Sequence, residues 1–84
     1  MPSWYLYIVR CADNSLYTGI TTDLERRTIE HNSSKLGSKY TRARRPVELV
    51  YQELFEDRST VSRRESEIKK MTPAQKRRLI KKSI

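Results

Sequence analysis

The sequence predicts an α+β fold: a three-stranded antiparallel sheet flanked by helices, in the order β-β-α-β-α-α. Residues 4–10 and 16–20 are rich in aromatic and β-branched side chains and are separated by a polar turn, which predicts a hairpin. Residues 47–55 read as a third strand. The remaining segments carry helix-start signals. At 84 residues we expect one domain over 1–84, with its core in about 4–71 and a C-terminal basic helix over about 73–82.

The two hairpin strands differ in character. The stretch "WYLYIVR" at 4–10 is apolar on both alternating faces, which predicts a strand covered on both sides. The turn uses Asp13-Asn14-Ser15, and "LYTGI" at 16–20 is the returning strand. Glycine weakens a strand interior, so we expect substrate or strand backbone to approach closely at Gly19.

The first helix is predicted to follow at once and to run to about 32–34. Thr22 and Glu25 have the spacing of a capping box, and Asp23 adds negative charge at the helix start. Leu24, Arg27, Thr28 and His31 share one helical stripe. Leu24 should face the core, with Arg27 and His31 on or beside the packed side and Arg26 and Glu30 pointing elsewhere.

The second half is predicted as a basic loop over 35–45, the third strand and two helices. Asp57 or Ser59 can cap a helix that runs through about Met71. The next helix, 73–82, starts with Thr72 as N-cap, Pro73 in its first position and Gln75 three residues past the cap.

The charge of the chain favours a polyanionic partner. Lys and Arg number 18 against 10 Asp and Glu, a formal net charge of +8. Two stretches lack acidic residues: five cations lie between 35 and 45 and seven between 69 and 82. Such stretches are either solvated surfaces or a nucleic-acid footprint, and a small basic domain typically meets a phosphate backbone.

The composition gives other function classes less support. A single cysteine excludes an intrachain disulfide, and one Cys with one His cannot supply the four ligands of a typical zinc site. Neither a signal peptide, a lipidation signal nor an apolar stretch near 18 residues stands out. We therefore expect a cytoplasmic protein that does not bind a membrane.

Two charged side chains are predicted on packed helix faces. Arg27 there needs an anionic partner, because burial of an unpaired charge is costly. On the second helix Glu65 lies between Val61 and Ile68, whereas Glu67 projects to solvent. Arg27 and Glu65 therefore form either a structural ion pair or parts of a site for phosphate and a divalent metal.

The remaining candidates also have two interpretations. His31 is either a helix C-terminal residue that favours the dipole or a functional group. Tyr7 and Tyr17 are either ordinary strand aromatics or site residues. Two strand tyrosines in one hairpin with a close-approach glycine, an inward arginine and an inward glutamate are the groups that metal-assisted phosphodiester cleavage uses.

Several motifs together resemble a known family. Tyr5-Leu6-Tyr7 and Tyr17-Thr18-Gly19 are similar to the two motifs of the GIY-YIG nuclease superfamily, with Tyr5 in place of the first motif's glycine. The stretches "TTDLERR" and "FEDRSTVSRRESEIKK" are also similar to small bacterial members. Over roughly 4–71 the chain resembles a small stand-alone bacterial member of this superfamily.

The resemblance implies a set of catalytic residues: Tyr7, Tyr17, Arg27, His31 and Glu65, with Gly19 as the motif glycine. Arg27 then donates to the phosphate oxygens, and Glu65 holds one Mg²⁺ or Mn²⁺ together with waters. Tyr7 is the general base, which requires nearby positive charge to lower its pKa, while Tyr17 orients the attacking water and His31 assists.

The function implied is that of a metal-dependent endonuclease that hydrolyses DNA, structure-selective or non-specific, in DNA repair or recombination. A protein partner is expected to supply specificity. The nucleic-acid-binding residues expected in the first basic stretch are Lys35, Lys39, Tyr40, Arg42, Arg44 and Arg45. Two alternatives stay open: a non-catalytic module that binds DNA or RNA, and an interaction subunit that docks through its C-terminal basic helix.

Overall fold

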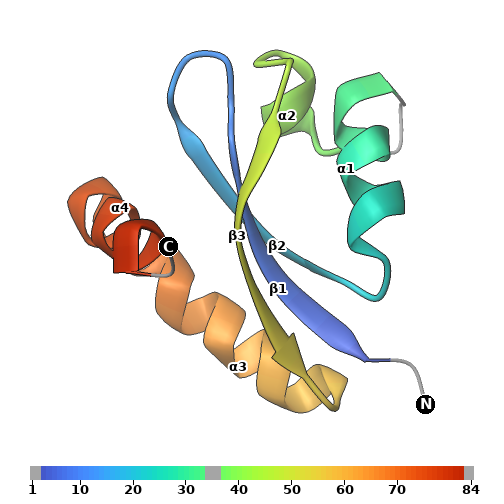
Figure 1. Cartoon of the computed structure of the whole chain (residues 1–84), viewed down its shortest axis with the longest axis vertical. Helices are drawn as coiled ribbons and strands as arrows, with labels where there is room; N and C mark the ends of the chain where they lie inside the picture. Colours follow the sequence, from blue (N-terminus) through green and yellow to red (C-terminus); the bar gives the residue numbers. More distant parts are fainter. Residues whose placement is uncertain (1–2, 34–36, 83–84) are drawn as a thin grey trace.

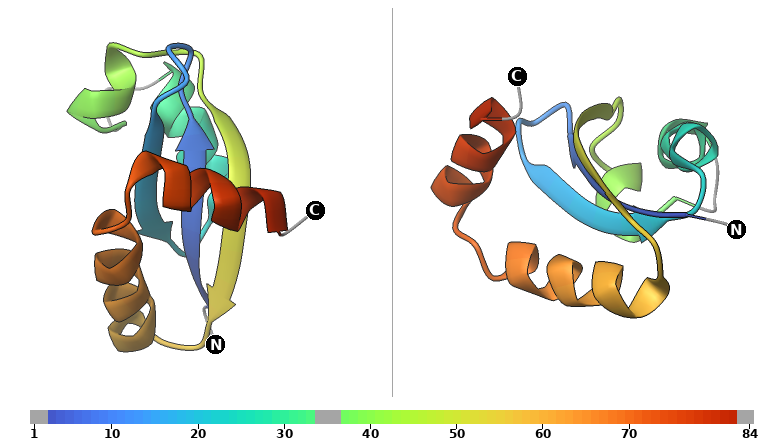
Figure 2. Two further views of the ribbon diagram at one scale, coloured as in Figure 1. Left: turned by 90° about the vertical axis from the view of Figure 1, so that its left-hand side faces the viewer. Right: turned by 60° about the horizontal axis from the view of Figure 1, so that its bottom comes forward.

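The computed structural model describes residues 3–33 and 37–82. One antiparallel sheet, with strand order β2-β1-β3, is built from β1 (Trp4–Arg10), β2 (Leu16–Thr21) and β3 (Glu48–Phe55). Its two faces are covered by different helices (Figures 1 and 2): α1 (Leu24–Ser33) with the short α2 (Lys39–Arg42), and α3 (Arg58–Lys69) with α4 (Pro73–Lys82). The predicted α+β architecture and element order are confirmed, with α2 as an addition.

The central strand β1 buries side chains on both faces. Leu6 and Ile8 have no exposed surface and pack with α3. Tyr7 and Val9 belong to a second buried cluster on the opposite face, which includes Val47. This two-sided burial accounts for the continuous apolar sequence of β1, because a central strand between two helical layers has no solvent face.

The hairpin turn and the last two helices start as predicted. Asn14 adopts a left-handed φ of 68°, a conformation that Asn tolerates better than most residues. The Asp57 carboxylate caps α3 by accepting a hydrogen bond from the Thr60 backbone N–H at 2.8 Å. Thr72 and Gln75 cap α4 reciprocally, with distances of 2.8 and 3.2 Å.

Two predictions about local structure are wrong. At α1 the cap is Asp23 rather than Thr22, since its Oδ1 accepts the Arg26 backbone N–H at 3.0 Å. The stretch predicted as a basic loop contains α2, where the Ser38 hydroxyl accepts the Thr41 backbone N–H at 3.1 Å. A helix of four residues is too short to show an apolar period, so only its cap is visible in the sequence.

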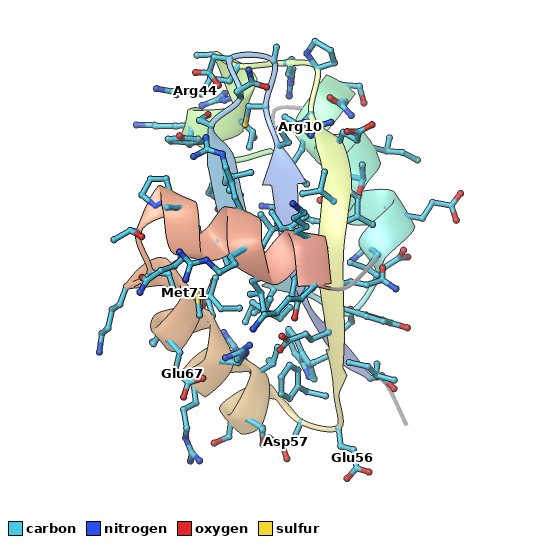
Figure 3. The ribbon with its side chains drawn as sticks, turned by 60° about the vertical axis from the view of Figure 1, so that its left-hand side comes forward. Arg10, Arg44, Glu56, Asp57, Glu67 and Met71 are labelled. Carbon is cyan, nitrogen blue, oxygen red and sulfur yellow. The ribbon has the colours of Figure 1, made fainter. Side chains whose placement is uncertain are left out.

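Helix α4 lies across the sheet on the same side as α3 (Figures 2 and 3). Met71 lies at the junction of the two helices, and Glu67 points away from the sheet, as predicted (Figure 3). Within the part of the chain that the structure describes, no helix is long and apolar enough to cross a membrane.

Candidate active site

Tyr7 and Gly19 face each other across the hairpin. Tyr7 of β1 pairs with Gly19 of β2 in the antiparallel register. A Cβ added to Gly19 would lie 2.5 Å from the Tyr7 hydroxyl oxygen and 2.7 Å from its Cζ. Within the protein, the close approach predicted at Gly19 is made by the Tyr7 ring rather than by a strand backbone. Gly19 has no positive φ, so space alone accounts for it.

His31 of α1 is fully buried between the two motif tyrosines. Its Nε2 lies 2.7 Å from the Tyr7 hydroxyl oxygen. The Tyr17 ring meets the imidazole edge-on, with 5.4 Å between ring centroids. The helical stripe predicted from the sequence thus directs His31 inward, where it touches both tyrosines.

Arg27 lies one turn before His31 and pairs with a residue of its own helix. Its Nη1 is 2.9 Å from Glu30 Oε1, and about a quarter of its side chain is exposed. Glu30 is predicted from the sequence to point away from the packed side of α1. It folds back instead, because side chains three residues apart on a helix are neighbours. Arg27 also stabilises the ionised form of the Tyr7 hydroxyl by a hydrogen bond and by its charge. Arg27, Tyr7 and His31 therefore form one cluster.

Glu65 lies on α3, which covers the other face of the sheet. Its carboxylate is largely covered, and it is paired with Lys69 of the same helix at 3.2 Å. The negative charge of Glu65 also opposes ionisation of the Tyr7 hydroxyl, so the two groups are close enough to interact electrostatically. Strand β2 lies at one edge of the sheet.

Burial controls the protonation of the cluster. It raises the pKa of the Tyr7 hydroxyl to about 12, outweighing the opposite effect of Arg27. Burial, reinforced by Arg27, lowers the pKa of His31 to about 4. The expectation that positive charge lowers the Tyr7 pKa below its ordinary value is therefore wrong for the free protein. At neutral pH, Tyr7 is protonated and His31 is neutral.

Comparison with known proteins supports the family resemblance that the sequence motifs indicate. The family model of the GIY-YIG catalytic domain matches residues 3–78. The chain belongs to the GIY-YIG family. Nucleases define this family, so the fold that presents the cluster is a nuclease fold with nucleic acid as the implied substrate.

Relatives within the family are small proteins of similar length. The chain is 58% identical over 82 residues to the UPF0213 protein of Desulfotalea psychrophila, covering 98% of this chain and 74% of that one. It is 55% identical over 80 residues to the UPF0213 protein of Staphylococcus haemolyticus, covering 95% and 96%.

Two solution NMR structures share the fold. The UPF0213 protein of Bacillus halodurans has a TM-score of 0.61 at 40% identity, with 94% of this chain and 83% of that one covered. A protein from E. faecalis has a TM-score of 0.66 at 43% identity, with 98% and 86% covered.

Two of the expected nucleic-acid-binding residues, Tyr40 and Arg44, pack next to Tyr17. The Tyr40 ring stacks on Tyr17, with 5.8 Å between centroids. The Arg44 guanidinium lies 4.0 Å above the Tyr40 ring centroid and also pairs with Asp13 at 3.1 Å. Tyr40 and Arg44 therefore extend an aromatic stack outward from His31 through Tyr17, which links α2 to the site.

The other members of that set lie in different surroundings. Arg45 donates from Nε to the His31 carbonyl at 2.5 Å and from Nη2 to the Glu30 carbonyl at 3.3 Å, so it supports the end of α1. Lys39 and Arg42 are exposed on α2 and available to a phosphate backbone. Lys35 lies outside the described residues.

The main residue that the sequence reasoning missed is Thr41. It is fully buried, and its Oγ1 lies 2.8 Å from His31 Nδ1. The one signal available was the spacing of Ser38 and Thr41, which is that of an N-cap and its third residue. Nothing local in the sequence indicates that the helix so capped packs against His31.

The chemistry of Glu65 suits a divalent metal. In residues 3–33 and 37–82, no group of three or more His, Cys, Asp or Glu side chains is placed to hold a metal ion. Mg²⁺ commonly takes one or two protein carboxylates and completes its shell with water and substrate oxygens. A single, partly exposed carboxylate whose present partner is an exposed lysine fits that mode of binding.

Proposed function

We propose that the chain is a metal-dependent endonuclease that hydrolyses the phosphodiester bonds of DNA. The observation that carries the proposal is the 2.7 Å contact between the Tyr7 hydroxyl and His31 Nε2, beside the Arg27 guanidinium. A core needs no buried tyrosine–imidazole pair for stability, because apolar side chains of similar size serve as well. Membership of a nuclease family gives the cluster a chemical purpose.

Tyr7 and His31 would act together on the attacking water. Burial raises the pKa of Tyr7 and lowers the pKa of His31, so both groups favour their neutral forms in the free protein. The proton therefore leaves Tyr7 only as its oxygen takes a proton from the water. His31 Nε2 receives the Tyr7 proton, and Tyr17 orients the water at the same edge of the site.

Arg27 would stabilise the charge that develops on the phosphate. Its ion pair with Glu30 holds the guanidinium at the site while leaving part of it exposed. A planar guanidinium can donate two hydrogen bonds to neighbouring phosphate oxygens. Removing one such donor typically costs about 100-fold to 1,000-fold in rate.

Glu65 would hold one Mg²⁺ or Mn²⁺ together with waters. When bound, that ion stabilises the leaving oxygen of the cleaved bond. Lys69 is about half exposed while Glu65 is largely covered, so solvent weakens the pair mainly from the lysine side. We propose that Lys69 releases the carboxylate when the metal binds.

The basic surface supports a polyanionic substrate. Lys39 and Arg42 are exposed on α2, and the acid-free stretch 69–82 includes α4. Contacts from such residues go mainly to phosphates, and these contacts position a substrate without reading its sequence. We propose DNA rather than RNA as the substrate, cleaved during DNA repair or recombination, with a protein partner to add specificity.

The direct test is a cleavage panel over duplex, flapped, forked and single-stranded DNA and RNA, with Mg²⁺, Mn²⁺ or a chelator. Two matched pairs of variants locate the activity: Arg27→Ala against Arg26→Ala, and Glu65→Gln against Glu67→Gln. Arg26 is a neighbour on α1 whose side chain is 65% exposed and lies 3.8 Å from Glu30, a longer pair than the 2.9 Å pair of Arg27. Glu67 points away from the sheet (Figure 3).

We expect metal-dependent cleavage that Arg27→Ala and Glu65→Gln reduce at least 100-fold while the control variants cleave like wild type. Equal rates for Arg27→Ala and wild type would remove Arg27 from the reaction. Binding that weakens with salt, without any metal-dependent product, would instead favour the non-catalytic nucleic-acid-binding module.

A further inference from the structure

The His31 ring is held at both nitrogens by hydroxyl groups from different parts of the chain. Nε2 lies 2.7 Å from the Tyr7 hydroxyl oxygen, and Nδ1 lies 2.8 Å from Thr41 Oγ1. Tyr7 comes from the central strand and Thr41 from α2, and both are buried. The arrangement ties the orientation of the imidazole to a helix that carries none of the GIY-YIG motif residues.

The surroundings of Thr41 offer its hydroxyl hydrogen an acceptor other than His31. The Thr41 hydroxyl has one hydrogen, and it is placed to donate that hydrogen to the Ser38 carbonyl at 3.2 Å. A carbonyl can only accept. Once the Thr41 hydrogen is used in this way, Oγ1 can only accept a hydrogen bond, and the donor is the N–H at His31 Nδ1. The lone pair of the neutral ring is then on Nε2.

Ser38 completes the same pattern. Its hydroxyl oxygen accepts the Thr41 backbone N–H at 3.1 Å and lies 3.0 Å from Thr41 Oγ1. The Ser38 hydroxyl hydrogen can therefore be donated to the second lone pair of Thr41 Oγ1. With Thr41 accepting from His31 Nδ1, Nε2 can accept the hydrogen of the Tyr7 hydroxyl, whose oxygen accepts from Arg27.

The chain between α1 and α2 lets Thr41 reach the ring. Gly37 is buried, and a Cβ added to it would lie 2.8 Å from the Glu30 carbonyl oxygen and 2.9 Å from the His31 Cα. Only glycine allows this segment to pass so close to the end of α1. The stacking of Tyr40 on Tyr17 holds α2 in the same place.

We propose that Thr41 is a positioning residue that fixes His31 in the tautomer protonated at Nδ1, so that Nε2 accepts the proton of Tyr7. The catalytic part of this inference rests on the endonuclease function proposed above. The tautomer itself does not, because it is inferred from the hydrogen-bond partners within the chain alone. With the opposite tautomer, Nε2–H would donate to the Tyr7 oxygen, and Nε2 could not receive the Tyr7 proton.

The experiment compares wild type with Thr41→Val and Thr41→Ser. Valine has nearly the shape of threonine but no hydroxyl, and serine keeps the hydroxyl. Because His31 is the only histidine in the sequence, its two ring nitrogens can be identified without ambiguity in long-range ¹H–¹⁵N NMR spectra. The ¹⁵N shifts distinguish the protonated nitrogen from the one that carries the lone pair.

We expect wild type and Thr41→Ser to be protonated at Nδ1, and Thr41→Val to move the proton wholly or partly to Nε2. In the cleavage assay we expect Thr41→Val to lower kcat by about 100-fold with little change in KM, and Thr41→Ser to restore it. Protonation at Nε2 in wild type would overturn the proposal, even if Thr41→Val failed to fold. An unchanged tautomer in folded Thr41→Val would overturn it too.

The spectra also separate this inference from the proposed function. A wild type that cleaves no nucleic acid but carries its proton at Nδ1, with loss of that preference in Thr41→Val, supports the positioning role and counts against the endonuclease. Cleavage by a wild type protonated at Nε2 supports the endonuclease and overturns the role of Thr41.

Discussion

Replacing Gly19 with alanine tests whether the motif glycine exists to make room for Tyr7. The new Cβ would lie 2.5 Å from the Tyr7 hydroxyl oxygen and 2.7 Å from Cζ, where ordinary contact begins at 3.4 Å. The end of the ring must therefore retreat by about 1 Å. That hydroxyl is hydrogen-bonded to His31 at 2.7 Å in a buried cluster, so it cannot move without disturbing this bond.

Two costs and one gain set the expected magnitude. Overpacking a core typically destabilises by about 1–3 kcal/mol. A weakened buried hydrogen bond adds about 1 kcal/mol. Alanine restricts the unfolded chain more than glycine and returns about 0.5 kcal/mol. Gly19→Ala should therefore lower the free energy of unfolding by about 1.5–3.5 kcal/mol, measured by urea denaturation with an unchanged m-value.

A double-mutant cycle with Tyr7→Val isolates the cause. Valine lacks all three ring-end atoms that the new Cβ would meet, namely the hydroxyl oxygen, Cζ and Cε2. In the Tyr7→Val background, Gly19→Ala should be neutral or slightly stabilising. If the cost of Gly19→Ala were equal in both backgrounds to within about 0.5 kcal/mol, the reasoning would be refuted, because residues that do not interact behave additively.

Other predictions follow from the buried ring, the α3 cap and the basic residues. Because burial lowers the pKa of His31 to about 4 from an ordinary value of 6.5, the folded state favours the neutral ring. The free energy of unfolding should accordingly fall by about 3 kcal/mol as the pH drops from 7 to 4, and a His31→Gln variant with the same pH slope would contradict this. Asp57→Ala should destabilise by about 1 kcal/mol in urea while Asp57→Asn, which still caps α3, changes little; equal losses would argue against the cap. Arg42→Ala should lower the salt dependence of DNA binding by about 0.9 in log–log slope without affecting stability. Arg45→Ala should instead destabilise by about 1–2 kcal/mol in the same denaturation assay, because it removes hydrogen bonds from a charged donor to the end of α1. A loss of salt dependence in Arg45→Ala and a loss of stability in Arg42→Ala would contradict these assignments.

Most of the secondary structure was predictable because its signals are local. The apolar stretch at 4–10, the Asp13–Ser15 turn and the caps at Asp57 and Thr72 each depend on a few neighbouring residues. The family motifs are local as well, which is why the sequence alone nominates Tyr7, Tyr17, Arg27 and Glu65 as candidates. The shift of the α1 cap from Thr22 to Asp23 is the size of error that such signals allow.

The contacts within the cluster were less predictable because they join distant segments. Nothing near Glu30 indicates that it pairs with Arg27 rather than facing solvent, since both placements satisfy the helical period. Arg44 and Arg45 look alike in sequence, yet one stacks on Tyr40 and the other binds carbonyls at the end of α1. Which of the two arginines binds the carbonyls of α1 depends on the tertiary path of the chain beside that helix.

The sequence by itself determined the order of the elements, the basic charge and the motif residues, because these depend on composition and on neighbours along the chain. Only the tertiary structure decided that Gly19 makes room for Tyr7, and that Thr41 reaches His31. It also reversed the predicted direction of the Tyr7 pKa. The physical reason is that strand register and burial arise from packing of the whole chain, and desolvation in that packing outweighs the nearby positive charge that the sequence makes visible.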